Sequence, residues 1–342
     1  MGPCCKKERA NNQDCKNVFH QQLYNANLPI KFYSVLEQFH DYFCYVNRGI
    51  LLMIASGLCF AIVNFLVKLL GPAEIPGFPD LQSYPAHELV LARSVVSFVI
   101  SMAVIKRRKL PVFGTNKKWL IIRGVSGTIA LTIFFYTLHH LPLAVATTVQ
   151  YLAPIFTIIF AMILLKERVR NIQWPFIILA FLGIILLALG KPANAAETEG
   201  ISIFWLGLGI ISAVLSGVAY VSIMKLKATD QPITIVLYFP MIAIPFMVIL
   251  CFWDFTFPNG IEWLILLTIG IFTQLAQISL TKALHEGLAS SIVPFQYLGA
   301  IYAFLIGYFI FLEELGTSLI LGMALVVTGV IVNSLLRVKA KK

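Results

Sequence analysis

Two pairs of uncharged polar side chains recur at a fixed spacing in this chain. Gln150 and Tyr151 are followed, 146 residues later, by Gln296 and Tyr297. An amide and a phenol both donate and accept hydrogen bonds without carrying a charge, which suits the binding of a neutral or zwitterionic solute. The alternative role is hydrogen bonding between neighbouring helices.

These pairs belong to a longer internal repeat. The run LHHLPLAVATTVQYLAPIF returns as LHEGLASSIVPFQYLGAIY at the same offset of 146 residues. The small-residue pairs Gly57/Ala61 and Ala213/Gly217 lie in corresponding segments of the two halves. The sequence therefore reads as a duplicated unit.

The composition is that of a protein that dissolves in lipid. Hydrophobic residues make up 59% of the chain, charged residues only 12%, and the mean hydropathy is +0.85. Such a chain has too little polar surface to cover a soluble core. A bilayer span needs ~20 mostly apolar residues. We predict an all-α polytopic membrane protein with ten transmembrane helices, near residues 49–70, 86–105, 118–138, 143–165, 172–190, 201–224, 232–252, 260–281, 288–312 and 316–336.

The net charge of +10 follows membrane topology rather than a nucleic-acid surface. Basic residues concentrate in alternate loops, at residues 106–118, 166–170 and 225–227. By the positive-inside rule these loops and both termini are cytoplasmic. Each repeat holds five helices, an odd number, so the second repeat crosses the membrane in the opposite direction. Two inverted five-helix repeats predict alternating access.

The expected organisation has four parts. Residues 1–47 form a cytoplasmic N-terminal segment, 48–190 the first repeat, 201–337 the second repeat and 338–342 a cytoplasmic tail. Apolar side chains at helical spacing over residues 32–46 indicate a short helix, either on the inner membrane surface or in the cytosol. No removable signal peptide is predicted.

Two arginines lie inside predicted spans. An ionised side chain there costs ~2.5–3.5 kcal/mol on insertion scales and normally faces a cavity or a partner. Arg93 is therefore a candidate for substrate contact at the outer mouth of a cavity, although snorkelling or packing is an open alternative. Arg123 lies near the inner end of its helix and is expected to be an interfacial anchor.

Other polar side chains complete the expected lining. Gln274 and Gln277 are three residues apart and share a helix face, while Asn64 and Tyr220 lie in corresponding helices of the two halves. Each could instead be an interhelical hydrogen-bonding group.

Four prolines interrupt hydrophobic helices. Pro154, Pro240, Pro245 and Pro294 each remove a backbone donor and free a carbonyl, which permits a kink or a gating hinge. Static kinks are the alternative.

The motifs of the first half resemble a known family. HELVLARS, QYLAPIF and LLKERV place Arg93, Pro154, Glu167 and Arg168 at the motif positions of the EamA branch of the drug/metabolite transporter superfamily. The resemblance covers about residues 48–337, with departures at Ala300 and at Glu314, which stands where an arginine is expected. It implies a secondary transporter of small organic solutes but does not name the solute. We expect a solute that is amino-acid-like or another polar metabolite.

Other function classes find less support in the sequence. No P-loop is present and no cluster of nucleophile and base predicts an enzyme. The cysteines lack metal-binding spacing, so neither a metal nor a cofactor is expected. A channel, an intramembrane enzyme and a scaffold are alternatives. The expected partners are the lipid bilayer of a bacterial inner membrane or a plasma membrane and the small solute, with no nucleic acid; a homodimer is left open.

Overall fold

The computed structural model describes residues 30–72, 81–165, 202–286, 298–311 and 316–339, with scattered positions between 174 and 186. The chain divides into two compact units, Met1–Asn47 and Arg48–Lys342. The candidate site lies entirely within the second unit.

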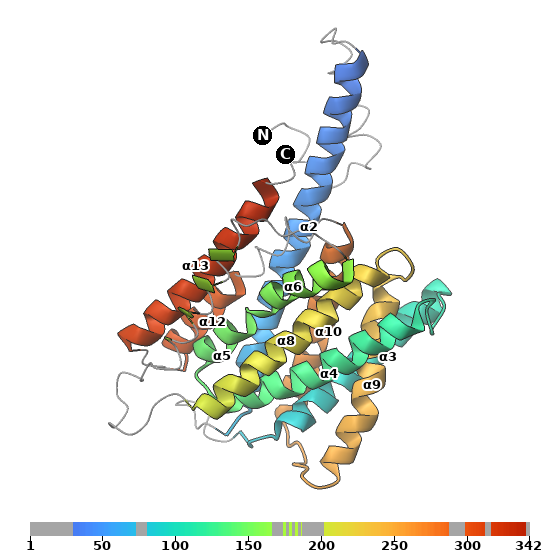
Figure 1. The fold of residues 1–342 in the computed structure, drawn as a ribbon. Helices are drawn as coiled ribbons and strands as arrows, with labels where there is room; N and C mark the ends of the chain where they lie inside the picture. The colour runs from blue at the N-terminus through green and yellow to red at the C-terminus, as the bar shows by residue number, and fades with distance from the viewer. Residues whose placement is uncertain are drawn as a thin grey trace. The chain divides into compact units, whose positions relative to one another are not determined.

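The described residues form helices and contain no strand (Figure 1). Seven helical stretches in this part of the chain are long and apolar enough to cross a bilayer. The helices are α2 (Ile30–Leu69), α3 (Ala86–Arg108), α4 (Lys117–His140), α5 (Leu143–Gln150), α6 (Ala153–Leu165), α8 (Ile203–Leu226), α9 (Pro232–Cys251), α10 (Glu262–Glu286), α12 (Leu298–Phe309) and α13 (Thr317–Lys339).

The all-helical membrane architecture predicted from composition is confirmed at this level. The seven stretches coincide with predicted spans one to four and six to eight. The predicted fifth span, residues 172–190, lies mostly outside the described residues, and the ninth is described only as α12. The total of ten helices and the inversion of the repeats stay predictions.

The helix predicted within the N-terminal segment differs in extent from the helix that the structure shows. The expected short helix over residues 32–46 is not a separate element, because α2 runs without interruption from Ile30 to Leu69. Gly49 alone does not end the helix, since one glycine costs only ~1 kcal/mol relative to alanine. The stretch that can cross a membrane begins at Arg48. The position of residues 30–47 at the membrane surface stays a prediction.

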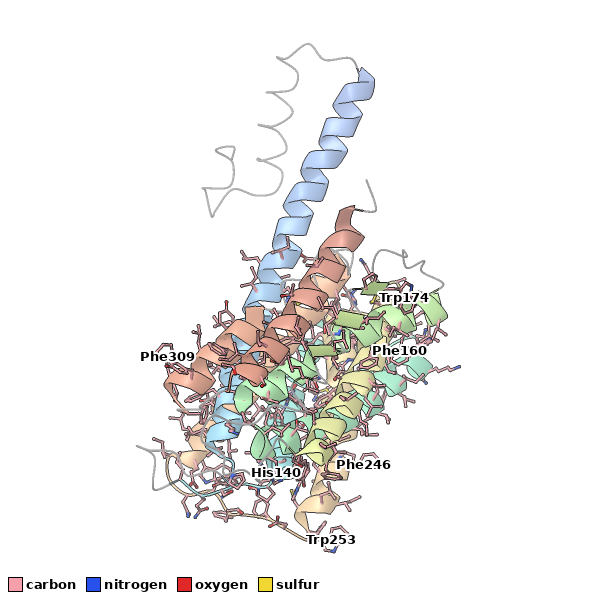
Figure 2. The ribbon with its side chains drawn as sticks, turned by 60° about the vertical axis from the view of Figure 1, so that its left-hand side comes forward. His140, Phe160, Trp174, Phe246, Trp253 and Phe309 are labelled. Carbon is pink, nitrogen blue, oxygen red and sulfur yellow. The ribbon has the colours of Figure 1, made fainter. Side chains whose placement is uncertain are left out.

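Large apolar side chains cover much of the outside of the second unit. Phe246, Trp253 and Phe309 are 59%, 79% and 69% exposed, and Figure 2 shows such side chains projecting away from the helices. Exposed apolar surface on this scale marks contact with lipid rather than with water. Trp253 follows the end of α9, where tryptophan is typical of the membrane interface.

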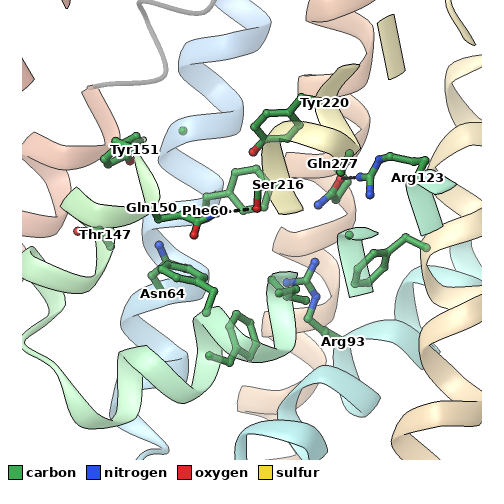
Figure 3. A pocket seen from close by; sticks show the side chains of 17 residues that line it. Phe60, Asn64, Arg93, Arg123, Thr147, Gln150, Tyr151, Ser216, Tyr220 and Gln277 are labelled. Carbon is green, nitrogen blue, oxygen red and sulfur yellow. Dashed lines mark hydrogen bonds between the residues drawn. The ribbon is translucent and has the colours of Figure 1, made fainter. Parts of the chain in front are cut away.

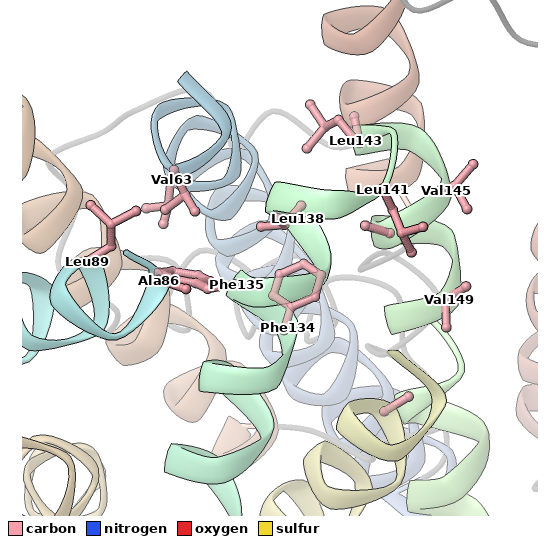
Figure 4. Packing of buried hydrophobic residues seen from close by; sticks show 14 of the residues in the cluster. Val63, Ala86, Leu89, Phe134, Phe135, Leu138, Leu141, Leu143, Val145 and Val149 are labelled. Carbon is pink, nitrogen blue, oxygen red and sulfur yellow. The ribbon is translucent and has the colours of Figure 1, made fainter. Parts of the chain in front are cut away.

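The largest buried apolar cluster of the described residues contains side chains of α2, α3, α4 and α5. Phe135, Leu138 and Leu143 are fully buried and pack with Val63 and Leu89 (Figure 4). These side chains come from α2, α3, α4 and α5, so one apolar core fixes the four helices around the end of α4.

The predicted fourth span is broken into two helices. α5 ends at Gln150 and α6 begins at Ala153, with Tyr151 and Leu152 forming a turn between them. Pro154 explains the break, because it has no N–H and its ring conflicts with the carbonyl four residues earlier, that of Gln150. Discontinuous helices of this kind are typical of binding sites in transporters.

Hydrogen bonds between the halves repeat with the sequence. Ser56 of α2 donates to the carbonyl oxygen of Ala276 in α10 over 2.9 Å, and Ser212 of α8 donates to that of Ala130 in α4 over 2.7 Å. Ala130 and Ala276 are 146 residues apart, and the two serines precede the corresponding small-residue pairs. The first helix of each half therefore bonds to the third helix of the other half.

Two glycines at the same offset allow close helix packing. A Cβ atom at Gly124 of α4 would lie 2.5 Å from Ile242 and 2.8 Å from the carbonyl oxygen of Tyr238, both in α9. A Cβ atom at Gly270 of α10 would collide with Val96 of α3. In each half the third helix therefore meets the second helix of the other half at a glycine.

A carboxylate contacts the beginning of α4 and another lies at the beginning of α10. The two contacts use equivalent positions of the two halves, but the carboxylate is on a different member of each pair. Asp230 accepts the backbone N–H groups of Thr115 and Asn116 over 2.5 and 3.2 Å, immediately before α4 begins at Lys117. Glu262 at the start of α10 accepts the Tyr84 hydroxyl over 2.5 Å. Tyr84 and Asp230 are 146 residues apart, as are Asn116 and Glu262. A carboxylate at a helix N-terminus is favourable in both places.

Replacing Tyr84 by phenylalanine should destabilise the protein by about 1.5–3 kcal/mol, the usual contribution of a hydrogen bond to a charged group. Burial and the Glu262 carboxylate raise the pKa of Tyr84. The contribution is therefore present below the ordinary tyrosine pKa of about 10 and is lost as the pH rises through the higher folded-state value. Unfolding of the purified protein in detergent, followed at neutral and alkaline pH, measures the change.

The matched control is Tyr308→Phe, because Tyr308 is 54% exposed on α12. Its free energy of unfolding should change by less than about 0.5 kcal/mol. Equal effects of the two substitutions would show that the Tyr84 hydrogen bond does not stabilise this contact.

Candidate binding cavity

A cavity opens between helices of both halves of the second unit (Figure 3). Its volume is about 110 Å³, whereas roughly 10–15 Å³ is enough for one water molecule. It can therefore hold several waters or a small organic group. The lining residues are Gly57, Phe60, Asn64, Arg93, Arg123, Gly127, Leu131, Phe134, Phe135, Thr147, Gln150, Tyr151, Ser216, Ala219, Tyr220, Phe239 and Gln277.

Arg93 presents its guanidinium group to this cavity from α3. The side chain is 1% exposed, and its Cζ lies 5.5 Å from the centre of the Phe135 ring and 5.3 Å from that of Phe239. None of its three guanidinium nitrogens has a hydrogen-bond partner among the described residues. The aromatic faces offset part of the cost of burying the charge. The charged end is buried, so Arg93 does not snorkel to an interface.

Arg123 also lines the cavity, and its expected role as an interfacial anchor is wrong. It is 3% exposed, and its Nη2 donates to Oε1 of Gln277 over 3.0 Å. Its Cζ lies 6.0 Å from the centre of the Phe239 ring. α4 packs against both α8 and α9, so the side chain is enclosed by protein.

A sequence signal for this placement exists in Gly127, one helical turn after Arg123. A Cβ atom at Gly127 would collide with Nη1 of Arg123 and would lie 3.2 Å from Cδ2 of Phe239. The missing side chain therefore leaves room for the guanidinium, which extends along α4 toward its C-terminal end. Gly127, four residues after Arg123, is the feature of the sequence that accompanies this placement.

Gln150 lines the cavity at the end of α5 while its amide links α5 to α8. Nε2 donates to Ser216 Oγ over 2.8 Å, and Oε1 lies 3.0 Å from Ser212 Oγ, whose single O–H is shared with the closer carbonyl oxygen of Ala130. Both roles considered for this residue therefore coincide in one side chain. Ser216 and Thr147, which also line the cavity, were not predicted from the sequence.

Tyr151 lines the cavity in the turn between α5 and α6. A Cβ atom at Gly299 of α12 would collide with the Tyr151 hydroxyl. The glycine therefore permits this phenol to reach α12, which packs against α5. The break in the fourth span thus contacts the second half of the sequence.

Three of the other predicted residues line the cavity and one does not. Asn64, Tyr220 and Gln277 belong to the lining. Gln274 lies outside it, because its amide is bound to two serines of α3: it accepts from Ser97 and donates to Ser101 Oγ over 2.7 Å. At 1% exposure this residue joins α10 to α3, the alternative role considered for such amides.

The remaining predicted residues do not line the cavity in the described part of the chain. Gln296, Tyr297 and Pro294 lie outside the described residues. Pro240 and Pro245 lie within α9, which continues through both of them from Pro232 to Cys251. The predicted convergence of the two Gln-Tyr pairs therefore stays a prediction.

The cavity lining contains no carboxylate among the described residues. The buried acids have other contacts: Glu88 accepts the backbone N–H of Thr256 over 3.0 Å, and Asp230 and Glu262 hold helix ends. Within the described ranges no group of three His, Cys, Asp or Glu side chains could hold a metal ion. The chemistry of the cavity is thus hydrogen bonding plus two positive charges.

Several named transporters are similar in sequence to this chain over most of its length. The pseudopaline exporter CntI of Pseudomonas aeruginosa (strain UCBPP-PA14) is 27% identical over 84% of this chain and 96% of its own length. The riboflavin transporter of Vibrio cholerae is 26% identical over 83% and 91%. Human solute carrier family 35 member G1 is 26% identical over 84% and 79%.

Fold and family comparisons agree with each other. A solved crystal structure matches with a TM-score of 0.60 and 19% sequence identity, covering 86% of this chain and 99% of that chain. The EamA-like transporter family matches residues 47–189 and again residues 203–335. Because these two matches account for most of the sequence, the chain belongs to the EamA-like transporter family.

Proposed function

We propose that this protein is a secondary transporter that moves a small polar organic solute by alternating access, with the cavity as its substrate site. The observation that supports this proposal most directly is that both halves of the sequence contribute residues to the lining of the cavity. Arg93, Arg123 and Gln150 come from the first half of the sequence, whereas Ser216 and Gln277 come from the second. A site shared by two repeats changes shape when the repeats move against each other.

The repeated contacts support inverted five-helix repeats. Ser56 and Ser212 make equivalent hydrogen bonds to opposite halves, and Gly124 and Gly270 sit at equivalent helix crossings. Reciprocal pairing of this kind is expected when two copies are related by a two-fold axis. With five spans in each copy, the axis lies in the membrane plane and the copies are inverted.

Loop charge supports a cytoplasmic position for the ends of the protein. Basic residues cluster at 106–109, around the end of α3, and at 117–118, the first residues of α4, and Lys225 and Lys227 lie at the end of α8. These positions are on one side if the spans alternate, and the positive-inside rule makes that side cytoplasmic. The membrane is the inner membrane of a bacterium or a plasma membrane.

The relatives support a polar metabolite as solute. The names of two of them describe export of pseudopaline and transport of riboflavin. These solutes differ in structure but are both small, polar organic molecules. A cavity that combines amides and hydroxyls with apolar aromatic walls suits that class, because polar groups fix orientation and apolar walls supply contact area.

Counterflow in proteoliposomes tests the transport function directly. Vesicles loaded with pooled unlabelled metabolites should accumulate a labelled solute of one class, with a rate that saturates. Gln150→Ala removes the amide that lines the cavity and bridges α5 to α8. The loss of its hydrogen bonds should reduce the counterflow rate by roughly fivefold to tenfold.

Gln231→Ala is the matched control, since Gln231 is exposed and makes no side-chain capping bond at the start of α9. Its counterflow rate should equal that of the unchanged protein. Flux that does not saturate and does not depend on internal solute would instead identify a channel.

The break between α5 and α6 can be tested by restoring a continuous helix. Pro154→Ala supplies the missing N–H and removes the ring that conflicts with the Gln150 carbonyl. The protein should become more stable by up to a few kcal/mol, and the counterflow rate should fall several-fold, because the break no longer bends. Thermal unfolding and counterflow on the same preparation measure both effects.

Pro245→Ala provides the comparison, because α9 continues through Pro245 and the residue is exposed. This substitution should leave the transport rate within about twofold. A Pro154→Ala protein that transports at the original rate would show that the break is static.

A further inference from the structure

We propose that the transported solute is an organic anion whose carboxylate group binds between Arg93 and Arg123. This inference rests on the proposed transport function and deepens it, because it names the charge and the chemical group that the cavity recognises. It replaces the neutral or zwitterionic solute expected from the Gln-Tyr pairs.

Two buried arginines give the described lining of the cavity a positive charge. Arg93 and Arg123 are both buried, and neither forms an ion pair with a described residue. An isolated buried charge is costly, so buried charges in proteins are normally paired. Membrane proteins retain such residues on substrate pathways. An anionic solute supplies the negative charge that the described lining does not contain.

The guanidinium group of Arg93 has donors available for a carboxylate. Its Nε, Nη1 and Nη2 all lack hydrogen-bond partners among the described residues. Its Cζ lies 5.5 Å from the centre of the Phe135 ring and 5.3 Å from that of Phe239, so two aromatic rings lie beside the charge. A planar fork of donors matches the two oxygens of a carboxylate in a bidentate arrangement.

Arg123 is positioned to assist before any solute arrives. Gln277 accepts from its Nη2, Gly127 leaves room for its Nη1, and Phe239 lies beside both arginines. A preorganised side chain loses little rotamer freedom on binding. The pair therefore forms one anion-binding side of the cavity.

The opposite side of the cavity is polar but uncharged. In Figure 3, Arg93, Arg123 and Gln277 appear on the right, and Asn64 and Gln150 on the left. The solute is thus expected to carry a carboxylate at one end and a neutral hydrogen-bonding group at the other. A cationic amine would meet two positive charges and no acid in the described lining, which selects against it.

A series of four-carbon probes separates charge from size. The probes have similar four-carbon skeletons and differ in charge. Succinate carries two negative charges, succinamate carries one, succinamide is neutral, and 1,4-diaminobutane carries two positive charges. The full-length protein in detergent is titrated with each probe, and its unfolding temperature is measured. Succinate and succinamate should stabilise it, and succinamide and the diamine should not. Inorganic phosphate, titrated in parallel, separates an organic carboxylate from any small anion.

Arg93→Gln removes the charge but keeps hydrogen-bonding groups, and it should raise the dissociation constant for succinate at least about tenfold. Without any probe this protein should unfold at the same or a higher temperature, because an unpaired buried charge has been removed. Arg107→Gln is the control, since Arg107 is exposed at the end of α3. Its succinate affinity should not change.

Gly127→Ala tests the placement of Arg123 without removing any charge. The added methyl group displaces only the flexible end of Arg123 and touches Phe239. The protein should fold, and its succinate affinity should fall about threefold to tenfold with the charge count unchanged. An unchanged affinity would remove Arg123 from the proposed site.

The outcomes separate this proposal from the transport function. Equal stabilisation by succinamide, the diamine or phosphate, a flat response to all probes, or an unchanged affinity in Arg93→Gln overturns the anion proposal. Counterflow of a neutral or cationic solute would then leave the transport function standing. Charge-selective binding with no counterflow of any bound anion supports the anion site and overturns transport.

Discussion

The interior of this protein is organised around two positive charges that no described residue neutralises. Arg93 and Arg123 lie inside membrane-crossing helices, where a low dielectric makes both desolvation and mutual repulsion large. The surrounding helices must therefore separate the two guanidinium groups from lipid. α9 packs against both α3 and α4, and Phe239 of α9 lies near both arginines. The rings and the Gln277 amide lower the cost without removing the charge, so the two arginines keep their affinity for an anion at the expense of stability.

Duplication explains the frame of the cavity but not its chemistry. Contacts between helices, such as those of Ser56 and Ser212, are kept in both halves because both copies must pack in the same way. The cavity positions have diverged. Leu131 and Gln277 are 146 residues apart and both line the cavity, one apolar and one polar, while the position equivalent to Arg123 is Ile269. A symmetric scaffold thus encloses an asymmetric site, which is what an asymmetric solute requires.

Much of the fold could be predicted from the sequence, because bilayer thickness fixes the length of an apolar helix. Pro154 was one of four prolines expected to interrupt helices, and a break occurs beside it, whereas α9 continues through Pro240 and Pro245. The faces of the helices could not be predicted in the same way. A helix that is hydrophobic all round gives no moment to separate lipid from protein contact. Arg123 was therefore expected at the interface and Gln274 in the cavity, whereas helix packing encloses the first and binds the second to Ser97.

The location of the break gives a bound anion mechanical consequences. Gln150 joins α5 to α8, and Tyr151 reaches Gly299 of α12, so the turn at the break contacts helices of the second half. The arginines that would hold the carboxylate belong to α3 and α4, which pack against that half as well. A ligand changes a conformational equilibrium only through its different affinities for the two states. A bound anion removes the repulsion between Arg93 and Arg123. It therefore favours the conformation in which both guanidinium groups contact the anion. The repulsion between the two arginines is then the source of the free energy by which a bound anion shifts this equilibrium.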